Sequence, residues 1–210
     1  MAVSGVGLFG FVFIHMFGNL KVYLGAEAFN HYAEWLREVG YPLLPHSGVL
    51  WIFRFGLLAL VLLHLTSAWQ VTQVSWKARP KGYKDWRPQA SDYASRTMRW
   101  GGVIIALFVV YHLAHFTWGW SWVHPDFIAG DPYHNFVAGF SVWWVSAIYV
   151  IAQLALGLHL YHGLWSIFQT LGWTNPRFNS WRRTFAQTFA LVTVAGNISF
   201  PLSVLAGWVQ

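Results

Sequence analysis

The chain has 210 residues, of which 56% are hydrophobic, 20% aromatic and 10% charged, with a net charge of +6. Soluble domains carry about 25% charged residues, so this composition excludes an ordinary soluble domain. The absence of cysteine excludes disulfides, cysteine-ligated metal clusters and attachment of a cofactor through a CxxCH motif.

Several apolar runs exceed the roughly 18 residues that a membrane-spanning helix needs. The sequence therefore predicts one all-α integral membrane domain over residues 1–210, with five transmembrane helices. The first run has no basic n-region and no small-residue cleavage site after it, so we expect it to be kept as a span. The predicted spans are residues 3–24, 47–76, 97–121, 137–171 and 183–208.

Charged residues are distributed unequally between the connections. The connections after the second and fourth spans are basic, whereas those after the first and third are mostly acidic. The positive-inside rule then places the N-terminus in the cytoplasm and the C-terminus outside, and it accounts for the net charge without nucleic acid. The basic residues concerned are Lys77, Arg79, Lys81, Lys84, Arg87, Arg96, Arg99, Arg177, Arg182 and Arg183.

The two outer connections differ in pattern. The segment GAEAFNHYAEWLREVG places apolar residues at helical spacing, so residues 26–39 are predicted to form an amphipathic helix on the outer interface. The segment HPDFIAGDPYHN is rich in turn-forming residues and is predicted to be an irregular connector.

Histidines occur within the apolar part of four spans, at His15, His64, His112 and His159. Ionisable residues inside a bilayer are costly and mark functional sites, and neutral imidazole is a common ligand of haem iron. Counting from the outer span ends places His15 and His112 at a shallow level and the other two about 16 Å deeper. Two pairs at two depths would suit two stacked bis-histidine haems inside a bundle of the first four spans, with the fifth peripheral.

Other histidines have less specific interpretations. For a single intramembrane histidine, the favoured interpretation is a core residue that is hydrogen-bonded across helices. His115 and His162 each lie one turn from a ligand candidate. We expect each of them to bind a haem propionate or to form an interhelical hydrogen bond.

Three segments carry a resemblance to a known family. They are SGVGLFGFVFIHMFGNL with the following GAEAFNHYAEWL, then LLHLTSAWQV in the second span and HLYHGLWSIFQTLGW in the fourth. Through them the chain resembles the membrane anchor of type B succinate:quinone oxidoreductases, which is the di-haem cytochrome b subunit of succinate dehydrogenase or fumarate reductase. The resemblance follows the order and spacing of spans one to four, and reaches the fifth only as a fifth span.

The resemblance implies that His64 and His159 are the axial ligands of a proximal haem near the cytoplasm. It implies that His15 and His112 bind a distal haem near the outside. Both assignments agree with the pairing by depth, and both haems would be b haems held without covalent bonds.

The resemblance also implies a subunit of the bacterial inner membrane rather than a self-sufficient enzyme. A flavoprotein subunit would oxidise succinate in the tricarboxylic acid cycle, and an iron–sulfur subunit would pass electrons to this chain. This respiratory anchor would deliver the electrons to a quinone in the lipid, and menaquinone is the expected quinone. A homotrimer of complexes is compatible with the resemblance. Some fumarate reductases of the family use a glutamate before the fourth-span ligand for proton transfer, whereas Gly157 and Leu158 stand here. A glutamate route is therefore not expected.

Quinone reduction needs an apolar slot, a hydrogen-bond donor and a proton supply. On the outer side, His46 and Arg54 are candidate donors to the quinone, and Glu38 is a candidate proton donor. Arg54 could equally bind a distal-haem propionate, because arginine suits carboxylates. On the inner side the candidates are Ser4 and Arg99. The favoured interpretation of Arg99 is a cytoplasmic anchor residue at the membrane surface.

Two other functions fit part of the pattern. One is the di-haem quinol-oxidising anchor of a nitrate reductase or formate dehydrogenase, whose ligand histidines would be distributed differently among the helices. The other is a haem-free structural anchor with histidines in its core.

Overall fold

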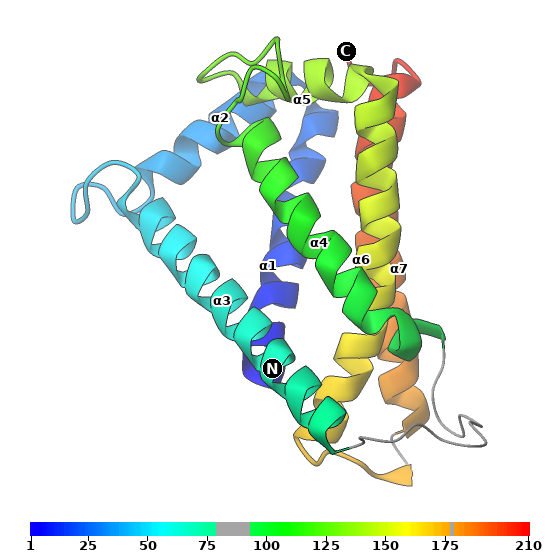
Figure 1. Cartoon of the computed structure of the whole chain (residues 1–210). Helices are drawn as coiled ribbons and strands as arrows, with labels where there is room; N and C mark the ends of the chain where they lie inside the picture. Colours follow the sequence, from blue (N-terminus) through cyan, green and yellow to red (C-terminus); the bar gives the residue numbers. More distant parts are fainter. Residues whose placement is uncertain (79–92, 177–178) are drawn as a thin grey trace.

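The computed structural model describes residues 1–78, 93–176 and 179–210. Within these residues there is no β-strand, and five helices are long and apolar enough to cross a membrane (Figure 1). The spans are α1 (Ala2–Asn19) continued by the 3-10 helix η1 (Leu20–Leu24), α3 (Gly48–Lys77), α4 (Tyr93–Phe116), α6 (Trp143–Thr170) and α7 (Asn179–Leu205). The all-α, five-span fold class is thus confirmed.

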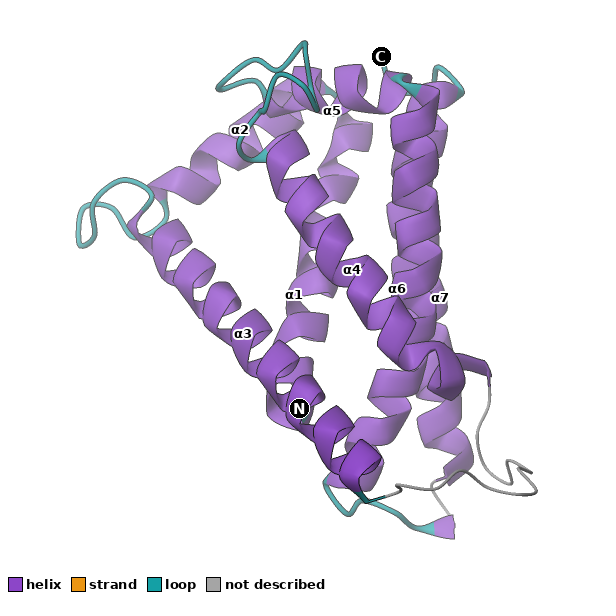
Figure 2. Cartoon of the chain, in the orientation of Figure 1, coloured by secondary structure: helices purple, strands orange, loops and turns teal. Residues whose placement is uncertain are grey.

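Two shorter helices, α2 (Ala26–Glu38) and α5 (Pro132–Ser141), lie across one end of the bundle (Figure 2). Helix α2 coincides with the amphipathic helix predicted for residues 26–39. Helix α5 replaces part of the predicted irregular connector and the start of the predicted fourth span. It begins there because Asp131 caps its first turn and proline occupies the first helical position. The extended residue Val142 then separates it from α6.

The predicted third span ends too late. Helix α4 ends at Phe116, five residues before the predicted end at 121. Gly119 has φ of +57° in the turn that follows, a left-handed conformation that favours glycine and ends the helical path.

Hydrogen bonds of the Asn30 side chain join helix α2 to the first turn of α5. Asn30 Nδ2 donates to Asp131 Oδ1 at 2.9 Å, and the backbone N–H of Tyr133 donates to Asn30 Oδ1 at 2.9 Å. The backbone N–H of His134 donates to Asp131 Oδ1 at 3.0 Å. This N–H, followed by the Asn30 amide, holds the pKa of Asp131 below its usual range.

The fifth span is not peripheral, contrary to the prediction. Helix α7 packs along α6 and buries small residues, among them Ala186 and Ala190. The helices approach so closely that a Cβ on Gly157 would lie 2.7 Å from Val194 Cγ2, and small residues permit such contacts within membranes. Helix α3, in contrast, buries no residue, packs mainly on α1 and α2, and slants away from the other spans (Figure 1).

The N- and C-termini lie at opposite ends of the bundle (Figure 1), as an odd number of spans requires. The orientation in the membrane stays a prediction, because most of the basic residues that support it are outside the described part of the chain. These are Arg79, Lys81, Lys84, Arg87, Arg177 and the side chain of Arg96.

Candidate functional site

One histidine pair joins α3 and α6. The ring centroids of His64 and His159 are 6.2 Å apart, with the ring planes at 61°. Ser4, buried in the first turn of α1, places its Oγ 3.2 Å from His64 Nδ1. In the described part of the chain, His159 Nδ1 is buried without a hydrogen-bond partner. This pair therefore lies at the end of the bundle that holds the N-terminus.

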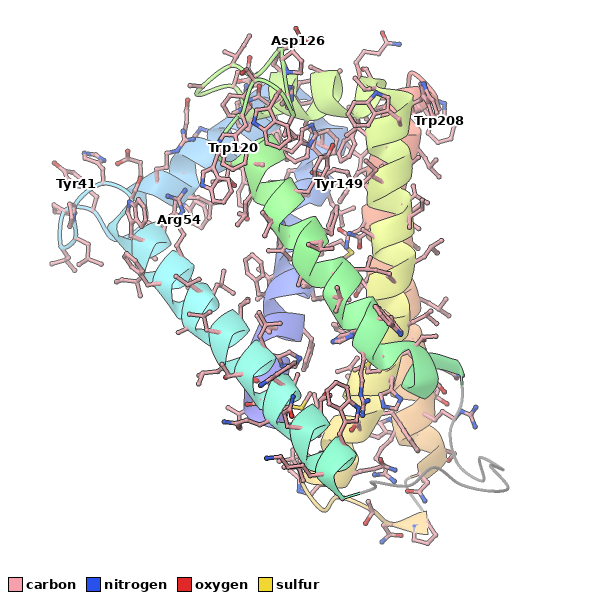
Figure 3. All side chains as sticks on the ribbon, in the orientation of Figure 1. Tyr41, Arg54, Trp120, Asp126, Tyr149 and Trp208 are labelled. Carbon is pink, nitrogen blue, oxygen red and sulfur yellow. The ribbon has the colours of Figure 1, made fainter. Side chains whose placement is uncertain are left out.

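A second histidine pair joins α1 and α4. The ring centroids of His15 and His112 are 5.9 Å apart, with the ring planes at 79°. The hydroxyl of Tyr149, which lies between α4 and α6 (Figure 3), is 3.2 Å from His112 Nδ1 and 2.9 Å from His115 Nδ1. Asn19 Nδ2 contacts His15 Nε2 at 3.5 Å, which is long for a hydrogen bond. The sequence-predicted pairs are thus the ones that lie together.

A cluster of buried polar side chains lies between the second pair and α5. His115 is completely buried, and its ring centroid is 4.7 Å from that of His124. His124 Nε2 donates to the backbone carbonyl of Asn135 at 2.9 Å. His115 thus has an interhelical hydrogen bond, to Tyr149, and His124 is buried in the connection between α4 and α5.

His162 and Arg54 have few contacts within the described residues. His162 Nδ1 is buried without a hydrogen-bond partner there. Arg54 is exposed on α3 near its α2 end (Figure 3), with its guanidinium carbon 4.8 Å from the ring centroid of Trp51. It makes no salt bridge in that part of the chain.

The residues predicted to bind quinone fall into separate places. His46 Nδ1 and Glu38 Oε1 are 3.0 Å apart on the surface, and the His46 ring stacks on Tyr41 with centroids 4.4 Å apart. Ser4 is buried against His64. The Arg99 guanidinium, on α4, lies 5.9 Å from the ring centroid of Trp76, on α3. Only His46 and Glu38 contact one another.

The two ring separations are suited to metal ligation. Two imidazoles that bind one ion through Nε2, with bonds of about 2 Å, have ring centroids about 6 Å apart. Among the described residues, no three His, Asp or Glu side chains gather into a metal site. Haem iron needs only two protein ligands, because the porphyrin supplies four nitrogens.

The family model of the succinate dehydrogenase/fumarate reductase transmembrane subunit matches residues 76–198, more than half of the chain. The chain belongs to this family. As a succinate dehydrogenase/fumarate reductase transmembrane subunit, it is a multi-pass membrane anchor that associates with a flavoprotein and an iron–sulfur subunit. No curated protein and no solved structure matches it. The matched region includes His112 and His159, whereas His15 and His64 precede it.

Sequence reasoning did not single out Tyr149. A signal was available, because a tyrosine hydroxyl within an apolar helix needs a hydrogen-bond partner. The sequence does not show which partner that is, since the answer depends on how α6 is rotated against α4.

Proposed function

We propose that the chain is the membrane anchor and electron-transfer subunit of a succinate:quinone oxidoreductase and that it binds two non-covalent b haems. The observation that carries this proposal is the pairing of four histidines from four spans, with ring centroids 6.2 and 5.9 Å apart. His64 and His159 would hold the proximal haem, and His15 and His112 the distal haem. A bound haem supplies reversible one-electron chemistry.

The neighbouring hydroxyls support this assignment. Ser4 contacts Nδ1 of His64 and Tyr149 contacts Nδ1 of His112. Each contact leaves the Nε2 atom of the same ring available to a metal and fixes the ring orientation. Outer partners of this kind are typical of metal-binding histidines.

Other polar groups would serve the haem substituents. Arg54, an exposed cation within an apolar span, would pair with a propionate of the distal haem. His162 carries a buried Nδ1 that would donate to a propionate of the proximal haem. His115, already hydrogen-bonded to Tyr149, would act within the protein interior instead.

In the proposed complex, succinate oxidation takes place on the flavoprotein, and electrons pass from the iron–sulfur subunit to a quinone in the lipid. The resemblance favours menaquinone and a bacterial inner membrane, and the positive-inside rule favours a cytoplasmic N-terminus. His46 and Glu38 form the more coherent candidate quinone contact, because they are hydrogen-bonded on the surface, where a proton donor stays connected to water.

The spectrum of the purified complex tests the proposal. A dithionite-reduced minus oxidised spectrum should show an α-band near roughly 560 nm, typical of bis-histidine b haems. Extracted haem should amount to two per chain, and a flavoprotein with covalent flavin should copurify. A chain without the band would be a structural anchor, and a molybdenum-containing partner would indicate a different respiratory complex.

A further inference from the structure

Tyr149 occupies a fixed position between two histidines of α4. Its side chain is 6% exposed, and its ring makes edge-on contacts with Phe108 and Phe140, at centroid distances of 4.9 and 4.8 Å. Its hydroxyl is therefore held in place, 3.2 Å from His112 Nδ1 and 2.9 Å from His115 Nδ1.

The proton inventory of these three groups allows few arrangements. A hydroxyl has one hydrogen to donate and lone pairs with which to accept, and a neutral imidazole carries one N–H. Both contacts are satisfied when one histidine donates to the Tyr149 oxygen and the other accepts the Tyr149 hydrogen.

The proposed function, on which this inference rests, selects one arrangement. A neutral His112 that binds iron through Nε2 carries its proton on Nδ1 and donates it to Tyr149. Tyr149 then donates to His115 Nδ1 over the shorter contact. His115 cannot easily turn away, because its Cε1 lies 2.7 Å from the position that a Cβ on Gly139 would take.

We propose that Tyr149 is the positioning residue of the distal pair: it holds His112 in the tautomer with a free Nε2 and, anchored by His115, fixes the orientation of the His112 ring. An acceptor at Nδ1 also makes the imidazole a more basic ligand. A more basic ligand favours oxidised iron and so lowers the potential of the distal haem relative to a site without this hydroxyl.

The test compares Tyr149→Phe with Tyr111→Phe in the full chain, purified in its complex. Tyr111 is a matched control, because its ring lies 6.1 Å from that of Tyr149 and its buried hydroxyl has no partner among the described residues. Tyr149→Phe should raise the midpoint potential of one haem. The equilibrium constant for reduction of that haem should increase by about fivefold, which is the effect of one neutral hydrogen bond. It should also change the low-spin electron paramagnetic resonance signal of that haem alone. Tyr111→Phe should change neither.

The outcomes separate this inference from the function beneath it. A wild-type complex without haem overturns the proposed function. If the complex holds two haems and Tyr149→Phe leaves both midpoint potentials unchanged, only the role of Tyr149 is overturned. The same holds if Tyr111→Phe shifts a midpoint potential by as much as Tyr149→Phe does. Loss of the distal haem alone supports the role. If Tyr149→Phe does not fold, the test is a redox-difference infrared spectrum of the wild-type complex with labelled tyrosine. A tyrosine band should appear when the distal haem is oxidised. The absence of such a band would contradict the proposal.

Discussion

Ser4 Oγ lies 3.2 Å from His64 Nδ1, so the first turn of α1 is hydrogen-bonded to a histidine within α3. The same hydroxyl donates to the Met1 carbonyl at 3.0 Å, which leaves its oxygen free to accept from the imidazole. The N-terminal turn, which no hydropathy pattern marks as special, is thereby tied to the proposed proximal haem site.

Ser4→Ala should weaken retention of the proximal haem. Loss of one hydrogen bond costs about 1 kcal/mol, so the temperature at which the proximal haem absorbance disappears should fall by a few degrees while two haems remain bound at rest. Thr66→Val is the control, because within the described part of the chain the Thr66 hydroxyl contacts carbonyls of its own helix, at Leu62 and Leu63. Equal behaviour of the two variants would show that the Ser4 contact has no role.

His64→Ala and His159→Ala should each remove one haem per chain, and the same one. Each ring would supply one of the two protein ligands of the proposed proximal haem, and a ring separation of 6.2 Å would suit two ligands of one iron. A pyridine haemochrome assay gives the count, and the redox titration of the remaining haem shows its identity. Loss of different haems in the two variants would contradict the pairing.

The sequence predicts the fold where apolar runs decide it. Each span is found because a bilayer requires about 20 apolar residues in one helix. The predicted fourth span begins too early because Asp131 followed by proline is typical of a turn, although an acidic cap before proline is also a helix start. The packing of α7 along α6 is not predictable in this way, because hydropathy gives the existence of a span and not its neighbours.

The histidine pairs were predictable for a related reason. Helical rise converts residue number into depth, so His15 could be matched with His112, and His64 with His159, without any knowledge of rotation. The contact of Tyr149 with His115 was not predictable in this way, since it depends on which faces of α6 and α4 meet. The burial of His124 depends on the path of a loop, which has no periodic signal.

Gly139→Ala should disrupt the polar cluster beneath α5. A Cβ there would lie 2.7 Å from Cε1 and 2.8 Å from Nε2 of His115, and 3.2 Å from His124 Nε2. Because these rings are buried and cannot withdraw, we expect a loss of about 1–3 kcal/mol, as for other overpacked cores. Thermal unfolding in detergent measures it.

Gly10→Ala is the matched control for that substitution. Gly10 lies within α1, and a Cβ at this position would have no described atom within 4 Å beyond its own helical neighbours. Alanine is favoured over glycine in a helix by about 1 kcal/mol, so this variant should be neutral or slightly stabilised. A loss as large as that of Gly139→Ala would mean that close packing at Gly139 is not the cause.

The Asp131 contact between α2 and α5 should make stability depend on pH in the acid range. Its carboxylate accepts hydrogen bonds from the backbone N–H of His134 and the side chain of Asn30, and these lower its pKa. A carboxyl whose pKa is lower in the folded state binds fewer protons there than in the unfolded chain. Its contribution is therefore fully present above the unfolded value of about 3.9 and is lost as pH falls through the folded pKa.

Three variants separate the cap from the charge. Asp131→Ala should cost about 1 kcal/mol at neutral pH, because it removes the cap of α5. Asp131→Asn keeps an acceptor but no charge, so its unfolding temperature should be below wild type at neutral pH and should converge with it as pH falls below 3.9, roughly the unfolded value. Asp126→Asn is the control, because Asp126 binds His134 Nε2 through its backbone carbonyl, which the substitution keeps. This variant should leave the pH profile unchanged. A constant difference between wild type and Asp131→Asn across the acid range would show that the carboxylate charge does not stabilise the α2–α5 contact.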